Sequence, residues 1–479
     1  MRSNKDPRVK SMARVRKVGW ALLVFGMSVC AAAQNSPQSQ PETAPAPAFG
    51  QNAPVLNPEN PPVSGLDVPS LELRTATRSF ISPGLLVSES ADTNGNNQLG
   101  NSSGLESITR VLGALDLQQF WPKSDLFLEY LGGGAFYGNP FHAEQLQAVG
   151  LEAVTRWRTG QVTVRDAFSY LPDGAFVMGF GGVPGFGFAN GGFATGMQGG
   201  GLPGLNSFGG ALGSVGNIPR LANTAILDVV QAISPTSAIT VAGGFSNTHF
   251  YDPTNTLINS DEVTVEAGYS HLLNRHDQIG VIYAFQLFQF PQETGGEIYS
   301  QIVNVRWSHT ITGRLSLVVG AGPQYTELEE GGSYTRWSLS ARAQLRYKFR
   351  RASLIASYEK YTSSGEGLFA GANTQVAALG YTRPLGRVWQ FFSDVSYSHS
   401  TQLQNVAVGG AHAGSYNNTS AGVILRRHWG RSYDFFGSYS FGELAFNVPV
   451  SIGGSTGRTS QRQTGAIGVE WHPKPTRIE

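Results

Sequence analysis

The chain has 479 residues, of which 41% are hydrophobic and only 14% are charged, with 34 Lys and Arg against 33 Asp and Glu. Soluble domains carry roughly 25% charged residues, whereas a helical membrane protein would be far more hydrophobic than this chain, whose mean hydropathy is -0.15. The composition therefore excludes a membrane bundle of helices. It fits a transmembrane β-barrel, in which only alternate residues meet lipid.

The N-terminal segment, residues 1–33, has the pattern of a cleaved signal peptide. Seven Lys or Arg precede the apolar run GWALLVFGMSVC, and AAAQ follows as a small-residue cleavage site. The alternative is an uncleaved anchor, although the run is shorter than the ~20 residues that a spanning helix needs. Cleavage after Ala33 leaves 27 Lys and Arg against 32 Asp and Glu, a net of -5, and removes the single Cys. The mature chain then has no basic excess for nucleic acid and no thiolate for a metal or disulfide.

Residues 34–75 form a segment rich in Pro, Gln, Ala and Asn, from QNSPQSQ onward. Such a composition favours extended backbone and buries little apolar surface. We expect a periplasmic linker here.

From residue 76 to 472 the sequence alternates polar and apolar residues, the period of a strand with one wet and one apolar face. The pattern begins in TRSFISPGLLVSES, is longest in RWSLSARAQLRYKFR from Arg336 to Arg350, and ends in GAIGVEW at Trp471. Strands of this length exceed the ~5 to 6 residues common in globular sheets. The short segments between them alternate with longer, Gly- and Asn-rich ones. Counting the strands gives about 18, or 16 if the first segment, TRSFISPGLLVSES, or one weak strand near Leu126 is not in the wall.

These features resemble those of the porin-type outer-membrane β-barrel proteins of Gram-negative bacteria, over nearly the whole mature chain. The resemblance implies an antiparallel transmembrane barrel in the outer membrane, inserted by the barrel-insertion machinery, with short periplasmic turns and long extracellular loops. The chain departs from this family at its end. The last strand pattern stops at Trp471, and His472 and a tail, residues 473–479 (PKPTRIE), follow it.

A barrel of 16 to 18 strands encloses an aqueous channel. The strand period directs charged side chains of both signs into this lumen: Arg110, Asp116, Glu129, Glu152, Arg156, Arg165, Glu266, Arg306, Arg314, Arg342, Arg346 and Asp394. Four of them, Arg306, Arg314, Arg342 and Arg346, fall on consecutive strands as a basic ladder that would favour anions. The alternative is that they are solvated wall residues paired with neighbouring carboxylates.

The longest connection, residues 173–216, places phenyl groups among many glycines. The hypothesis is that it folds into the barrel and narrows the pore through Phe176, Phe180, Phe186, Phe188 and Phe193. A surface loop is the alternative, since a glycine-rich backbone is pliant.

No motif predicts an enzyme, a cofactor or a metal site. The Gly-rich matches near Ser102 and Ser455 lack the strand-turn-helix setting of a nucleophile elbow, and the nine His residues lack ligand spacing. The predicted function is passive diffusion of small hydrophilic solutes. The alternatives are a structural or surface-interaction barrel with a closed lumen, a lipid hydrolase with a Ser/His pair on the outer wall, and a transporter of hydrophobic substrates. The sequence leaves the solute and the oligomeric state open.

Overall fold

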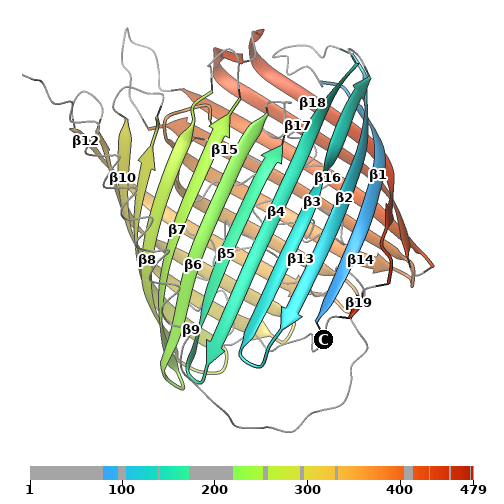
Figure 1. Cartoon of the computed structure of the whole chain (residues 1–479). Helices are drawn as coiled ribbons and strands as arrows, with labels where there is room; N and C mark the ends of the chain where they lie inside the picture. Colours follow the sequence, from blue (N-terminus) through green and yellow to red (C-terminus); the bar gives the residue numbers. More distant parts are fainter. Residues whose placement is uncertain are drawn as a thin grey trace, which may run out of the picture. The chain divides into compact units, whose positions relative to one another are not determined.

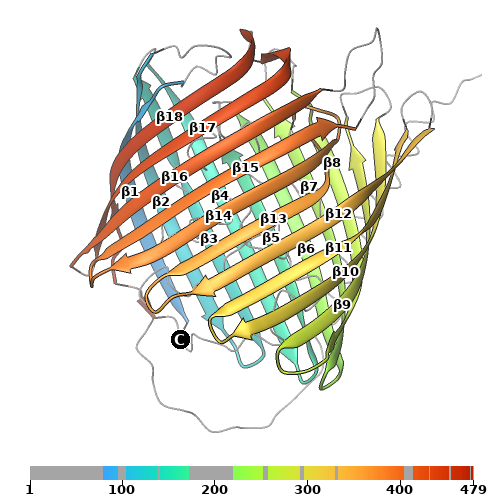
Figure 2. The same cartoon turned by 180° about the vertical axis from the view of Figure 1, so that it is seen from behind.

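The computed structural model describes a single antiparallel sheet that closes on itself (Figures 1 and 2). It describes residues 79–94, 104–138, 141–171, 219–251, 257–291, 296–329, 333–365, 367–403, 414–430, 432–452, 455–474 and 476–477. All of them belong to the unit Pro47–Glu479. The predicted signal peptide, the linker and the Gly/Phe-rich connection lie outside the described residues.

Neighbouring strands in sequence are neighbours in the wall. In chain order they are β1 (Phe80–Asp92), β2 (Glu106–Phe120), β3 (Ser124–Gly138), β4 (Phe141–Trp157), β5 (Gly160–Leu171), β6 (Arg220–Ser234), β7 (Ser237–Phe250), β8 (Ser260–Leu272), β9 (Asp277–Gln289), β10 (Glu297–Thr312), β11 (Leu315–Glu329), β12 (Ser333–Lys348), β13 (Ser353–Ser363), β14 (Ala372–Leu385), β15 (Trp389–Gln402), β16 (Ser415–Trp429), β17 (Tyr433–Ile452), β18 (Ser455–Trp471) and β19 (Thr476–Arg477). The ring closes where β18 pairs with β1, from Leu85 opposite Trp471 to Asp92 opposite Thr464.

The sheet of the described residues has 19 strands, so the sequence count of about 18, or 16, was wrong. The additional strand is the two-residue β19, which pairs with the start of β1 at Phe80 and Ile81. Part of the tail after Trp471 therefore belongs to the sheet. The alternation of polar and apolar residues could not reveal it, because two residues are too few to show a period.

The two ends of the barrel differ in the connections they carry. At one end, which we call the turn end, each even-numbered strand from β2 to β16 joins the next through two to four residues. At the other, the loop end, the connections run from two residues, between β3 and β4, to the 48 residues between β5 and β6.

The wall is apolar outside and polar inside, because successive side chains of a strand point to opposite faces. In β8 the buried, inward positions include Glu262, Thr264 and Glu266, whereas Val265 and Tyr269 are exposed outside. Aromatic residues gather at the strand ends beside the short turns: Trp157, Trp307, Trp389, Trp429, Tyr433 and Trp471. This is the girdle that membrane barrels place at the headgroup level.

One connection at the loop end folds inward. Residues 364–371, between β13 and β14, are called the inner loop. Its backbone is tied down by hydrogen bonds from Gly371 N–H to Ser364 C=O (3.0 Å) and from Ile258 N–H to Gly367 C=O (2.9 Å). Gly371 has φ of 84°, and a Cβ there would lie 2.2 Å from Ile298 Cδ1. Only glycine satisfies both the left-handed backbone and this close approach.

Candidate functional site in the barrel interior

Several predicted lumen residues do face inward and are buried. Arg110, Glu266, Arg306 and Arg342 have exposed fractions of 0%, 0%, 2% and 8%. Arg110 donates a hydrogen bond through Nη1 to Ser90 Oγ on the neighbouring strand β1. The interior of the barrel therefore holds charged side chains of both signs.

Arg306 and Arg342 lie in one row across three strands. Gly320 of β11 is the register partner of both, and Arg342 is also opposite Glu359 of β13. A Cβ on Gly320 would come 2.8 Å from Arg306 Cγ, so the missing side chain leaves the space that Arg306 occupies. Arg342 Nε lies 3.5 Å from Glu359 Oε1. This row thus contains two cations beside one carboxylate.

Of the other two residues of the expected basic ladder, Arg346 lies on the wall and Arg314 does not. Arg346 is half-buried on β12, four residues from Arg342 and on the same face. Arg314 is exposed in the turn between β10 and β11, away from the wall, because β10 continues to Thr312 and leaves only two residues for the turn. Of the other predicted residues, Arg156 contacts Asp125 through Nη1 at the turn end.

Five predicted lumen residues have side chains outside the described part of the structure, although their backbones lie in strands. They are Asp116, Glu129, Glu152, Arg165 and Asp394. The same holds for the phenylalanines expected to constrict the pore, Phe176, Phe180, Phe186, Phe188 and Phe193, which fall in the Gly/Phe-rich connection.

Sequence reasoning missed a charged cluster at the turn end of β16, β17 and β18. Arg426 Nη2 lies 2.6 Å from Asp434 Oδ2 and also contacts Glu470 Oε2. His428 and His472 contact the same Asp434 carboxylate. Arg426, Asp434 and Glu470 are exposed by only 1%, 3% and 0%. The signal was hidden because the run VILRRHW contains adjacent apolar residues and adjacent cations, which obscure the period of two.

Sequence reasoning also missed two pairs that join β18 to β1 and the residues after it, where the barrel closes. Arg462 of β18 donates through Nε to Asp92 Oδ2 of β1 (2.7 Å), and Asn94 Nδ2 donates to Ser460 Oγ (3.0 Å). The residues of each pair are hundreds of positions apart in the chain. Only the closure of the ring brings them together.

The inner loop places apolar side chains inside the barrel at the loop end. Phe369 belongs to one buried cluster with Phe250, Leu257, Ala372, Tyr416, Leu444 and Phe446. Ala370 belongs to another with Phe288, Phe290, Ile298, Leu328 and Leu403. The Phe369 and Tyr416 ring centroids are 5.4 Å apart. The inner loop therefore packs against inward side chains of strands on either side of its own hairpin.

Hydroxyl and amide groups hold the base of the inner loop. Gln324 Nε2 donates to Thr362 Oγ1 (2.6 Å) and to Ser300 Oγ (2.8 Å). Ser363 and Thr374 hydroxyls lie 2.8 Å apart. These buried groups hydrogen-bond to one another, so polar contacts at its base and apolar contacts of Phe369 and Ala370 both attach the inner loop to the wall.

The outer face carries polar pairs among its apolar side chains. Five tyrosines donate their hydroxyls to an amide on the next strand, in the pairs Tyr130–Gln147, Tyr283–Gln301, Tyr358–Gln375, Tyr397–Asn417 and Tyr439–Gln463. Two histidines join this set. His271 Nδ1 lies 2.8 Å from Ser237 Oγ, and His399 lies between Asn417 and Thr401.

Among the residues that the structure describes, no helix is long and apolar enough to span a membrane. The same part of the chain contains no group of three or more His, Cys, Asp or Glu arranged to hold a metal ion.

A closed antiparallel barrel, an apolar outer wall, an aromatic girdle and a charged interior are together the features of a transmembrane β-barrel. The chain matches no protein-family model and no curated protein. Solved structures similar to it include Pseudomonas aeruginosa OccK2 (OpdF) in complex with glucuronate, at 12% identity and a TM-score of 0.42, covering 83% of this chain and 98% of that one. Acinetobacter baumannii OccAB3 is 9% identical, with a TM-score of 0.42 and coverage of 82% and 99%. Pseudomonas aeruginosa OpdO is 14% identical, with a TM-score of 0.41 and coverage of 83% and 97%.

Proposed function

We propose that the protein is a channel for passive diffusion of small hydrophilic solutes across the outer membrane, with the turn end on the periplasmic side. The observation that carries this proposal is the charged and polar interior of a closed barrel whose outer wall is apolar. Water and polar solutes are stabilised by such an interior, whereas lipid is excluded from it.

The pore in this proposal is narrow at the loop end. The inner loop carries Phe369 and Ala370 into two apolar clusters inside the wall. We further propose that the Gly/Phe-rich connection contributes to the narrowing through its phenylalanines. Deletion of Gly181 to Gly204 should then raise the conductance, whereas a connection that stays outside the lumen would leave it unchanged.

A mild preference for anions is also proposed. Arg306 and Arg342 lie in one inward row with the carboxylate of Glu359, and Arg346 follows on the same face of β12. Buried cations of one row favour anions by Coulomb attraction in a lumen of lower dielectric constant than bulk water.

Reconstitution of the signal-free protein in planar bilayers tests both parts. We expect discrete conductance steps. In a salt gradient, we expect a reversal potential that indicates a higher permeability to anions than to cations. Arg342→Ala with Arg346→Ala should move the anion-to-cation permeability ratio toward one. Arg427→Ala is the matched control, because Arg427 lies over the Trp389 ring at 5.4 Å on the outer face. A ratio near one in the unmodified protein would remove the selectivity proposal but not the channel.

A closed-lumen barrel remains the second candidate, and one observation favours it. Many inward polar side chains, including Gln286, Ser300 and Gln324, are fully buried, with exposed fractions of 0%. A folded barrel that inserts into bilayers without any conductance would favour this candidate. Its loops would then be the functional surface.

A further inference from the structure

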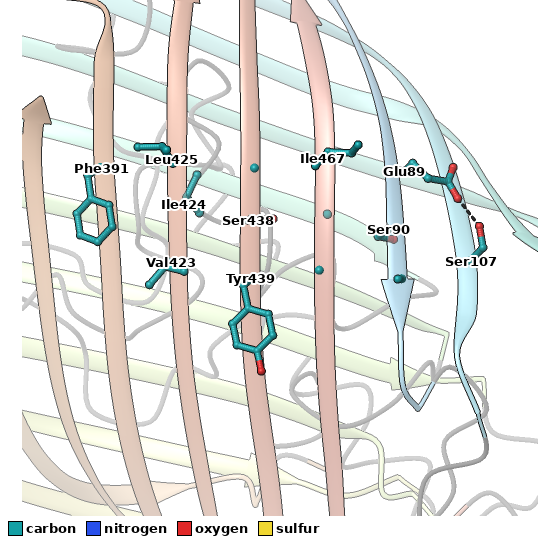
Figure 3. Close-up of a pocket in the computed structure, with 14 residues that line it drawn as sticks. Glu89, Ser90, Ser107, Phe391, Val423, Ile424, Leu425, Ser438, Tyr439 and Ile467 are labelled. Atoms are coloured by element: carbon teal, nitrogen blue, oxygen red, sulfur yellow. Dashed lines mark hydrogen bonds between the residues drawn. The ribbon is translucent and has the colours of Figure 1, made fainter. Parts of the chain in front are cut away.

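A pocket of about 650 Å³ lies on the wall formed by β15 to β18, β1 and β2 (Figure 3). Its lining comprises two outward-facing rows of the sheet and, between them, the row of Ile424, Ser438, Ala466 and Ser90. One row runs through Phe391, Leu425, Gly437, Ile467 and Glu89, and the other through Val423, Tyr439, Gly465, Ala91 and Ser107. This volume is within the range of small-molecule sites, roughly 300 to 1,000 Å³.

The pocket opens outward, toward the membrane. Val423, Leu425, Tyr439 and Ile467 are exposed by 42%, 39%, 46% and 69% on the outer face. Since the outer wall of a membrane barrel meets acyl chains, the surrounding lipid is the molecule that has access to the pocket.

The floor of the pocket is open because two of its residues lack side chains. A Cβ on Gly465 would meet no atom within 4 Å, and a Cβ on Gly437 would meet only the Ala466 carbonyl oxygen, at 4.0 Å. Leu425 and Ile467 flank Gly437 in the sheet. Their apolar side chains therefore border a trough over Gly437 and Gly465, which is as deep as the space that side chains at these two positions would fill. A flexible acyl chain fits such a trough better than a rigid protein surface does, because it adopts the shape of the floor.

At one end of the trough stands a carboxylate. Glu89 is exposed, points outward from β1 and accepts hydrogen bonds from Ser107 Oγ and Thr109 Oγ1 through its two oxygens. The two hydroxyls fix the carboxylate in place, and Figure 3 shows Glu89 directed toward Ser107 at the border of the pocket. An ionised group on the lipid-facing wall is costly unless a partner of opposite charge compensates it.

We propose that this pocket binds a phospholipid that carries a primary ammonium group, with its acyl chain in the Gly437–Gly465 trough and its ammonium at Glu89. The ammonium supplies both the positive charge and N–H donors that a carboxylate accepts. A quaternary ammonium has the charge without the donors, and a glycerol headgroup has O–H donors without the positive charge. The headgroup chemistry therefore distinguishes specific binding from general solvation by lipid.

The test is native mass spectrometry of the delipidated barrel, titrated separately with phosphatidylethanolamine, phosphatidylcholine and phosphatidylglycerol of the same chain length. We expect phosphatidylethanolamine to bind about tenfold more tightly than the other two, since a hydrogen bond to a charged group contributes about 1.5 kcal/mol. Glu89→Gln should abolish this preference. Gly465→Leu should weaken binding of all three lipids, because leucine fills the trough.

Two control variants make the same chemical changes elsewhere on the outer face. Glu443→Gln removes a carboxylate that accepts a hydrogen bond from Gln461, and Ala267→Leu adds apolar bulk to an exposed position of β8. Both should bind lipid like the unmodified protein. Heat-modifiable electrophoretic mobility confirms that each variant is folded.

Equal binding of the three lipids, or a preference that survives Glu89→Gln, would overturn the proposal. If Gly465→Leu changed the fraction of dimers and not the bound lipid, the trough would be a contact between two copies of the chain, which also overturns it. Conductance of the same variants separates this site from the channel, since neither Glu89 nor Gly465 faces the lumen.

Discussion

Two regions of the barrel interior are held together by different interactions. At the turn end, Arg426 is buried between Asp434 and Glu470. At the loop end, the inner loop is held chiefly by Phe369 and Ala370 in their apolar clusters. Ions constrain position and register strongly but contribute little net stability once their desolvation is included. Apolar contacts stabilise by excluding water and allow more movement. We infer that the ion pairs at the turn end hold the strands of the wall in register and that the inner loop determines the width of the pore at the loop end.

The largest effect is expected from Arg426→Met. Without the guanidinium, two buried carboxylates face each other in direct register on β17 and β18, and removal of one partner of a buried pair costs about 3 to 5 kcal/mol of unfolding free energy. Urea unfolding in detergent, followed by electrophoretic mobility, measures the loss. Arg427→Met changes the adjacent outward residue and should cost less than about 1 kcal/mol. Equal losses in the two variants would show that the cluster is not what holds the turn end.

Phe369→Ala should have the next largest effect on stability and the largest on conductance. Truncation of a buried phenylalanine costs about 3 kcal/mol where the surroundings can partly relax. Removal of the ring also widens the loop end, so single-channel conductance should rise. Phe435→Ala, on the outer face, should leave conductance unchanged. A conductance that stayed constant in Phe369→Ala would mean that the inner loop does not limit the pore.

Two glycines sharpen the comparison between the ends. Gly371 in the inner loop and Gly386 in a turn have φ of 84° and 80°, so alanine strains both backbones by about 1 to 2 kcal/mol. Only at Gly371 does the new Cβ also meet a neighbour, Ile298, whereas at Gly386 it meets nothing within 4 Å. Gly371→Ala should therefore lose about 1 to 3 kcal/mol more than Gly386→Ala. Thermal unfolding of the two variants compares them directly, and similar melting temperatures would contradict the packing of the inner loop.

The smallest effect is expected from Arg156→Met, also at the turn end. Its side chain is 25% exposed and contacts the carboxylate of Asp125, so water screens the pair more than it screens Arg426. A loss of about 1 kcal/mol is expected, and it should shrink in high salt. The loss in Arg426→Met should change little with salt. The opposite order of salt dependence would mean that burial does not distinguish the two ion pairs.

A histidine on the outer face allows a test of whether the polar pairs there are structural or take part in lipid hydrolysis. The sequence predicts no enzymatic activity, and the Ser237–His271 and Thr401–His399 contacts occur among the recurring polar pairs of the outer wall. His399→Ala should therefore leave release of fatty acid from phospholipid vesicles at background. A release above background that is lost in His399→Ala would instead indicate a hydrolase.

Much of the fold could be predicted from the sequence because the strand period is a local property. The alternation in residues such as Val265, Glu266 and Ala267 needs only neighbouring positions to be recognised, and it predicted both the wall and the inward direction of Arg110, Glu266, Arg306 and Arg342. Where the alternation is broken, as around Ile424 and Arg426, the sequence failed to assign the inward cation. The expected inward position of Arg314 failed because the period cannot tell where a strand ends and a turn begins.

The sequence by itself determined the closed antiparallel barrel, its apolar outside and its charged inside, since each follows from side chains that alternate along a strand. Only the tertiary structure decided which charges meet, as in Arg462 with Asp92, and which connection turns inward. Both depend on residues that are distant in the chain and adjacent only after the ring has closed. The inner loop packs against Tyr416 of β16 and Phe446 of β17, and no local pattern in SSGEGLFAGAN carries that information.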